Sequence, residues 1–159
     1  MVGKGPITSA LATSLGSKAM ALSAKFKALD LYISSAGGEV NAGLLIYNTI
    51  QTLNVKVRTI CFGRAHSVAS LVLAGGRSGC RRALMGSSVS LHRPSAGSFG
   101  NVDEVVQHVS SAVCSEAAVV QAYMKVCDRR LNEVRAAMVR SFAMDVSEAW
   151  AWGLIDGIL

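Results

Sequence analysis

Residues 29–62 run as a strand, a glycine turn, a helix and a second strand, and this order most constrains the fold. The stretch "LDLYIS" (29–34) is rich in β-forming residues, and the glycine pair that follows turns the chain. The segment "VNAGLLIYNTI" (40–50) predicts a helix, and "VKVRTICF" (55–62) predicts a second strand. Two strands joined by a helical crossover lie parallel, so the sequence predicts a βαβ unit in a parallel sheet.

The same alternation extends on both sides of this unit. Apolar residues recur at three- and four-residue steps from Ile7 to Phe26 and predict a helix with one buried stripe. After the second strand, "SVASLVLAGG" (67–76) predicts a short helix opened by Ser67, and "SSVSLH" (87–92) predicts a third strand that ends at His92. The fold class is therefore α/β.

Helical patterns dominate the last third of the chain. Valines at helical spacing predict a long amphipathic helix over 102–127, and apolar residues at 131, 134 and 138 predict another. The sequence "DVSE" (145–148) is typical of an N-cap box, and "GLIDGIL" closes the chain as a short strand. Without internal repeats or a low-complexity linker, we expect a single domain over 1–159.

Composition predicts association with other subunits. Hydrophobic residues make up 51% of the 159 residues, charged residues 16%, and the mean hydropathy is +0.39. A monomer of this size does not easily bury so much apolar surface, so we expect an oligomer. Every apolar stretch is interrupted before the roughly 20 residues that a bilayer requires, so no membrane association is expected.

The charge is +6, but Lys and Arg are scattered and aromatic residues are few, which does not favour nucleic-acid binding. The four cysteines form no CxxC pair and have no histidine at zinc spacing, so neither a metal site nor a disulfide framework is predicted. The first 29 residues contain four lysines, no acid, and many Ser and Ala. This composition is typical of an organellar transit peptide or equally of a core helix. We expect an intracellular protein, with mitochondrion or plastid favoured over cytoplasm.

Reactive groups gather where parallel strands end. Gly37 and Gly38 follow the first predicted strand, Ser67 follows the second, and His92 ends the third. A serine at a helix N-terminus lies beside unpaired N–H groups, and a glycine pair lets another N–H approach, so the two could form an oxyanion hole. The histidine could accept the serine proton. Each residue also has a structural interpretation, as a turn, a helix cap or a structural histidine.

Four stretches resemble, in order, the signatures of the proteolytic subunit of the ATP-dependent Clp protease: "LYISSAGGEVNAGLLIYNTIQ", "VRTICFGRAHSVAS", "SLHRP" and "EAWAWGLIDGIL". The resemblance runs from about residue 29 to 159 and more faintly back to Gly3. It implies a crotonase-like α/β fold that stacks as two heptameric rings of identical or paralogous subunits. It also implies that an ATP-driven unfoldase feeds unfolded polypeptides to the rings. The helix over 102–127 is similar to the handle helix that lies between the rings.

The resemblance assigns roles residue by residue. Ser67 matches the nucleophile, His92 the general base, and the N–H groups of Gly38 and Val68 the oxyanion hole. The glycine-rich loop after His92 matches the segment along which extended substrate peptide pairs. No cofactor and no metal are implied, because ATP belongs to the partner.

The third position of the family's triad departs from the pattern. The family has an aspartate there, and this chain has Ser141 after Arg140. Asp145 is the nearest substitute, but its spacing to Glu148 favours an N-cap, and we expect Asp128 to form a surface ion pair with its neighbouring arginines. His66 adjoins Ser67, but neighbouring side chains diverge, so we do not expect it to reach the Ser67 hydroxyl.

Three functions therefore stay open from the sequence. The first is a serine endopeptidase subunit of a Clp-type complex, with Ser67 and His92 active. The second is a catalytically impaired paralogue that acts as a structural subunit of a mixed ring or of another large organellar complex. The third is an acyl-CoA hydratase-like relative that shares the superfamily fold, which the short chain and the Ser/His pair disfavour.

Overall fold

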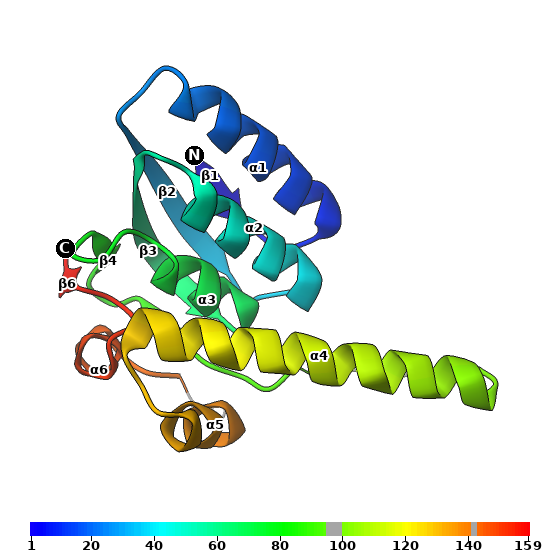
Figure 1. Cartoon of the computed structure of the whole chain (residues 1–159). Helices are drawn as coiled ribbons and strands as arrows, with labels where there is room; N and C mark the ends of the chain where they lie inside the picture. The colour runs from blue at the N-terminus through cyan, green and yellow to red at the C-terminus, as the bar shows by residue number, and fades with distance from the viewer. Residues whose placement is uncertain (95–99, 141–142) are drawn as a thin grey trace.

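The computed structural model describes residues 1–94, 100–140 and 143–159 (Figure 1). Its centre is a parallel sheet, which confirms the α/β prediction. The strands pair in the order β1 (Val2–Lys4), β2 (Ala28–Ser35), β3 (Lys56–His66), β4 (Arg81–Ala83), β6 (Gly157–Ile158), with β5 (Ser88–Ser90) also paired to β3.

The predicted βαβ unit forms the middle of the sheet. Strand β2 pairs in parallel with β3, and α2 (Val40–Thr52) connects them. Alternate residues of β2 are buried, among them Leu31 and Ile33, as the period of two along a strand requires. The helix buries Ile46 and Ile50 in the same core. Hydrophobic patterning thus suffices to explain this part of the fold.

Strand β3 is longer than the predicted 55–62 and extends to His66. Its first half pairs with β4 over Thr59–Cys61, and its second half pairs with β5 over Arg64–His66. The added residues belong to the strand because a second neighbour satisfies their backbone groups. Strands β1 and β4 were not predicted, because three-residue strands carry almost no periodicity of their own.

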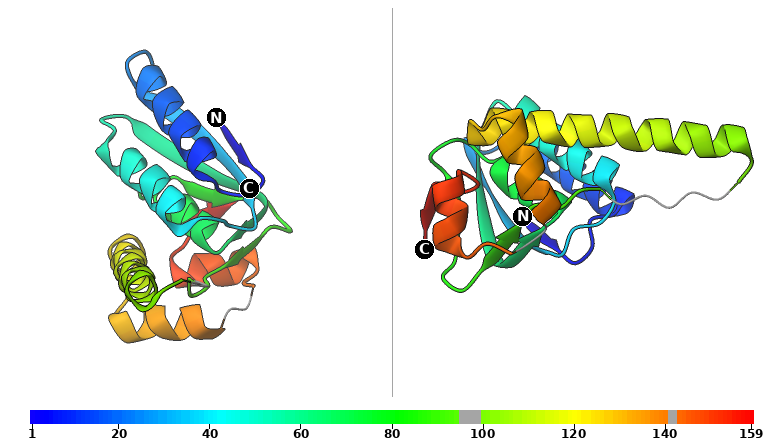
Figure 2. Two further views of the ribbon diagram at one scale, coloured as in Figure 1. Left: turned by 90° about the vertical axis from the view of Figure 1, so that its right-hand side faces the viewer. Right: turned by 90° about the horizontal axis from the view of Figure 1, so that it is seen from below.

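Helices α1 (Ser9–Ser23), α2 and α3 (Val68–Ala74) pack in series beside the sheet (Figures 1 and 2). Helix α1 buries Ala12, Leu15 and Ala19, which confirms the predicted stripe. The stripe does not reach Phe26: α1 ends at Ser23, and this ring, 55% exposed, lies in the connection to β2. The basic start of the chain is therefore a packed strand and helix in this fold.

Helix α4 (Val102–Cys127) has the predicted bounds and is the longest element. Asn101 and Glu104 form a capping box at its start. Its N-terminal half protrudes from the rest of the protein, and its buried residues begin at Val119 (Figures 1 and 2). Helices α5 (Leu131–Arg140) and α6 (Val146–Trp152) follow, and α5 packs against α4. None of the described helices combines the length and hydropathy that crossing a bilayer requires.

Candidate functional site

Ser67 forms the sharp turn between β3 and α3. Its backbone lies at φ 53° and ψ −133°, and in the described part of the chain only Asp128 is another non-glycine residue with positive φ. A side chain in this region costs on the order of 1–3 kcal/mol, and such residues concentrate at functional sites. Ser67 stands at the N-cap position of α3, as the structural interpretation expected, but its side chain makes no capping hydrogen bond, so capping does not explain its hydroxyl.

Glycines make room for this turn. A Cβ atom on Gly37 would lie 2.7 Å from the Ser67 Cβ and 3.2 Å from its Oγ. A Cβ atom on Gly43 would lie 2.0 Å from a methyl group of Val68. Two glycines from the loop and helix after β2 therefore allow the serine and the start of α3 to approach closely, as the glycine turn in the sequence suggested.

The two candidate oxyanion donors directly follow the residues of this contact: Gly38 follows Gly37, and Val68 follows Ser67. Gly37 and its neighbours are held by main-chain bonds: the Ile7 N–H donates to Gly37 O over 2.9 Å, and the Glu39 N–H donates to Ile7 O over 2.8 Å. Within the described residues, no hydrogen bond takes up the N–H of Gly38 or that of Val68. Unused donors beside a serine hydroxyl are what an oxyanion hole requires.

His92 lies two residues beyond β5, because β5 ends at Ser90, so the prediction that His92 ends this strand is wrong. In the β3–β5 register His66 pairs with Ser90, so Ser67 and His92 emerge at the same edge of the sheet. The Ser67 N–H donates to Ser90 O over 2.9 Å and fastens the two strand ends together. The His92 ring is exposed, and among the described residues it bonds neither Ser67 Oγ nor any carboxylate. The structure brings the two elements together without closing the Ser–His contact.

The other polar candidates have different partners. Ser141 lies outside the described residues. Asp145 caps α6 and accepts a 2.8 Å bond from the Glu148 N–H, which confirms its structural role. The expected surface ion pair of Asp128 was wrong. This residue ends α4 in a left-handed conformation, its neighbour Arg129 bonds Glu133, and no ion pair of Asp128 occurs in the described ranges.

His66 is directed to the neighbouring strand. Its Nε2 lies 2.8 Å from the hydroxyl oxygen of Ser88, which agrees with the expectation that it does not serve Ser67. Burial lowers the pKa of His66, and the positive charge of Arg64 lowers it further. This imidazole is therefore mainly neutral at pH 7 and acts as a link between β3 and β5.

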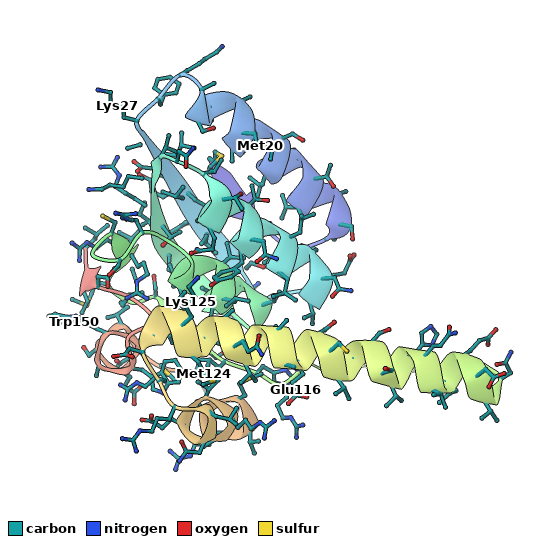
Figure 3. All side chains as sticks on the ribbon, in the orientation of Figure 1. Met20, Lys27, Glu116, Met124, Lys125 and Trp150 are labelled. Carbon is teal, nitrogen blue, oxygen red and sulfur yellow. The ribbon has the colours of Figure 1, made fainter. Side chains whose placement is uncertain are left out.

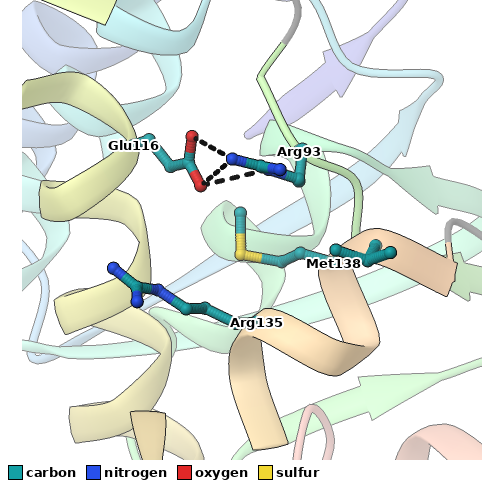
Figure 4. Close-up of a pocket in the computed structure, with 5 residues that line it drawn as sticks. Arg93, Glu116, Arg135 and Met138 are labelled. Atoms are coloured by element: carbon teal, nitrogen blue, oxygen red, sulfur yellow. Dashed lines mark hydrogen bonds and ion pairs between the residues drawn. The ribbon is translucent and has the colours of Figure 1, made fainter. Parts of the chain in front are cut away.

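A cleft begins at the residue after His92 (Figure 4). Arg93 forms a two-point ion pair with Glu116 of α4, with both hydrogen bonds at 3.2 Å. Arg135 and Met138 of α5 complete a cavity of about 370 Å³. A second cavity of about 500 Å³ shares both arginines and continues between α4 and α5 past Met124. Glu116 and Met124 lie on the side of α4 that faces α5 (Figure 3).

Sequence reasoning missed the pair of hydroxyls behind Ser67. Ser70 Oγ lies 2.8 Å from the Tyr123 hydroxyl, and both side chains are fully buried. Ser70 falls on a predicted helix and Tyr123 on another, and no sequence signal says that positions 53 apart would meet. The Arg93–Glu116 pair was missed for the same reason.

No group of three His, Cys, Asp or Glu side chains suited to a metal ion occurs in the parts of the chain that the structure describes. The described site consists instead of a strained serine, a histidine two residues beyond the adjacent strand, and two N–H groups without a described acceptor. This arrangement on a parallel sheet defines the class: an α/β protein with a candidate site of the serine-hydrolase type.

The family follows from comparison with known families. The family model described as Clp protease matches residues 1–159, the whole chain. The chain belongs to the Clp protease family, which confirms the resemblance and favours a serine peptidase over the acyl-CoA hydratase-like alternative. Membership of this family implies, in general, oligomeric rings of Clp subunits that work with unfoldases.

Proposed function

We propose that this chain is a serine endopeptidase subunit of an ATP-dependent Clp-type complex that degrades unfolded polypeptides delivered by an unfoldase. The observation that carries the proposal is the conformation of Ser67. The chain holds a serine at φ 53°, without using its hydroxyl as a cap, next to two N–H groups with no other described acceptor. Strain of this kind concentrates at functional sites, and a strained serine on a strand-to-helix turn is the arrangement that presents a nucleophile.

In the proposed reaction, Ser67 Oγ attacks the carbonyl carbon of a peptide bond while His92 takes the hydroxyl proton. The N–H groups of Gly38 and Val68 donate to the negative oxygen that forms. His92 then gives its proton to the leaving amine, and an acyl-enzyme remains. A water molecule, deprotonated by His92, releases the acyl group and restores Ser67.

The residue at position 141 limits this reaction. A serine hydroxyl can orient an imidazole but supplies no charge to stabilise the imidazolium. In serine proteases, replacing the triad carboxylate by an amide lowers turnover about 10⁴-fold and leaves measurable activity. We therefore expect slow turnover with Ser67 still reactive.

The second candidate is a catalytically impaired paralogue that serves as a structural subunit of a mixed ring or other large organellar complex. The side chain at 141 favours it, and so does the absence of any carboxylate on His92 within the described residues. Both candidates need an assembly. Exposed valines along α4, together with Met20 and Trp150 (Figure 3), provide apolar surface for stacked heptameric rings.

Labelling of the assembled protein with a fluorophosphonate probe separates the two candidates. We expect covalent labelling at Ser67 that is lost in Ser67→Ala and kept in Ser78→Ala, a matched change of an exposed serine. A fluorogenic peptide assay on the same samples measures the expected slow turnover. An unlabelled wild type in a verified tetradecamer would contradict the peptidase and leave the structural subunit. The compartment, mitochondrion or plastid, stays a prediction.

A further inference from the structure

Ser70 and Tyr123 form a buried hydroxyl pair directly behind Ser67. Ser70 lies in α3 and Tyr123 in α4. The two helices pack against each other (Figure 1). Ser70 is 0% exposed and Tyr123 is 1% exposed. Burying two hydroxyl groups costs free energy unless both find partners, so the partners of this pair show what it serves.

The partners are the main chain of the turn and of β5. The Ser67 carbonyl lies 2.7 Å from Ser70 Oγ, 3.0 Å from the Ser70 N–H that donates to it, and 3.4 Å from the Tyr123 hydroxyl. Ser70 Oγ also lies 2.9 Å from the Ser90 carbonyl. The pair therefore connects the candidate nucleophile to the strand that precedes His92.

Burial keeps the tyrosine in its donor form. Burial raises the pKa of Tyr123 far above its usual range, although the hydrogen bond to Ser70 acts in the opposite direction. The phenol therefore stays protonated throughout the pH range in which a peptidase works. Its proton is available to Ser70 Oγ or to the Ser67 carbonyl.

These bonds fix both dihedral angles of Ser67. The peptide plane before Ser67 is held by the Ser67 N–H, which donates to Ser90 O over 2.9 Å. The plane after it is held by its carbonyl, which Ser70 and Tyr123 contact. With both flanking planes held, φ and ψ between them cannot relax to the favoured regions.

The same contact orients a candidate oxyanion donor. The Ser67 carbonyl and the Val68 N–H belong to one planar trans peptide and point in opposite directions. Holding the carbonyl in the core therefore turns the Val68 N–H outward, to the side on which a substrate carbonyl would lie. No other described side chain bonds this carbonyl.

We propose that Ser70 and Tyr123 are positioning residues that hold the Ser67–Val68 peptide, and with it the nucleophile and one oxyanion donor, in the reactive orientation. This inference rests on the proposed function for its catalytic consequence. Its structural content, the orientation of one peptide plane, can be observed whether or not Ser67 is reactive.

The test uses Ser70→Ala, Tyr123→Phe and the double variant in the assembled protein. We expect the rate of Ser67 labelling by the fluorophosphonate to fall about tenfold in Ser70→Ala, which removes the 2.7 Å contact to the Ser67 carbonyl. In Tyr123→Phe, which removes the 3.4 Å contact, we expect a fall of about threefold. The value of kcat should fall by similar factors, with KM changed less than about twofold. Tyr47→Phe is the matched control, because Tyr47 is also buried but lies in α2, and its labelling rate should match that of the wild type.

Crystal structures of the wild type and the double variant complete the test. We expect Ser67 to leave the positive-φ region, or the Ser67–Val68 peptide to rotate, once both hydroxyls are gone. An unchanged peptide orientation in the double variant would overturn the inference, and so would an unchanged labelling rate in folded, assembled Ser70→Ala. If the wild type itself is not labelled at Ser67, the proposed function fails, and the structural comparison alone decides the inference.

Discussion

At the scale of single residues, the site depends on positive backbone φ angles, which are unfavourable for residues other than glycine. Ser67 occupies φ 53°, and Gly37 beside it occupies φ 102°. The positive φ strains the backbone of Ser67 but not that of Gly37, because glycine has no Cβ atom. Only position 67 needs a side chain for the proposed reaction. This difference leads to two predictions that separate strain from chemistry.

Ser67→Gly should raise the free energy of unfolding by about 1 kcal/mol, because glycine relieves the positive φ and loses part of the gain to its own backbone entropy. Ser67→Ala keeps the Cβ atom and should change the free energy by less than about 0.5 kcal/mol. Both should abolish labelling. Urea unfolding at equal protein concentration measures the difference, and equal stabilities for the two variants would show that Ser67 is not strained.

Gly37→Ala should lower the free energy of unfolding by at least about 2 kcal/mol for two reasons. The added Cβ atom would lie 2.7 Å from the Ser67 Cβ, and alanine is strained at the φ of 102° that this position requires. Gly79→Ala is the matched control: Gly79 has φ 82° but open space around it, so only about 1 kcal/mol of backbone strain is expected. Thermal unfolding measures both variants. Equal losses would mean that the contact with Ser67 is unimportant.

At the scale of elements, a buried arginine of β4 connects this strand to several segments in the C-terminal part of the chain. Arg81 of β4 donates from Nε and Nη2 to the Asp156 carboxylate and from Nη1 to the carbonyls of Val126 and Gly153. One side chain therefore fastens β4 to the ends of α4 and α6. Breaking a buried pair of this kind leaves an unpaired charge, which destabilises far more than losing a surface pair.

Asp156→Asn should lower the free energy of unfolding at pH 7 by about 3–5 kcal/mol. The loss should depend on pH. Burial alone would raise the pKa of Asp156, but the hydrogen bonds from Arg81 outweigh burial and lower it overall. Because this pKa is lower in the folded state than in the unfolded state, the ionised carboxylate stabilises the fold at pH values above the usual carboxyl pKa. This stabilisation is lost as the pH falls through the folded-state pKa. The difference in free energy of unfolding between wild type and variant should therefore become smaller below about pH 4.

Urea unfolding at pH 7 and at pH 3 measures this gap. Asp30→Asn is the control, since Asp30 pairs with Arg58 at the surface and should cost less than about 1 kcal/mol at pH 7. A gap for Asp156→Asn that stays constant between the two pH values would contradict the assigned role of its carboxylate.

At the scale of the whole molecule, the protruding half of α4 carries the clearest sign of assembly. Four valines of this half are between 54% and 78% exposed, and they fall on one stripe of the helix: Val102, Val106, Val109, Val113. The bounds predicted for the amphipathic helix are therefore correct. Its apolar stripe at this end is covered by no described part of the same chain. Apolar surface of this extent fits contact with another subunit.

The double substitution Val106→Asp and Val109→Asp should shift the assembled protein to smaller species, because charges on the stripe cannot be buried between subunits. Sedimentation velocity measures the distribution. Ser111→Asp is the matched control, since it adds a charge to the exposed opposite side of the same helix, about half a turn away. If the double variant assembled normally and Ser111→Asp did not, the subunit contact would lie on the side of α4 that carries Ser111.

The sequence by itself determined the βαβ alternation, the bounds of α4, the capping box at Asp145 and the placing of Ser67 and His92 after neighbouring strands. These features depend on local periodicity and on residues close in the chain. Only the tertiary structure decided the strained backbone of Ser67, the neighbouring N–H groups that no described acceptor takes up, and the contacts of Ser70 with Tyr123 and of Arg93 with Glu116. Those depend on which distant segments meet, because a short strand or a buried hydroxyl is stable only once packing supplies its partner.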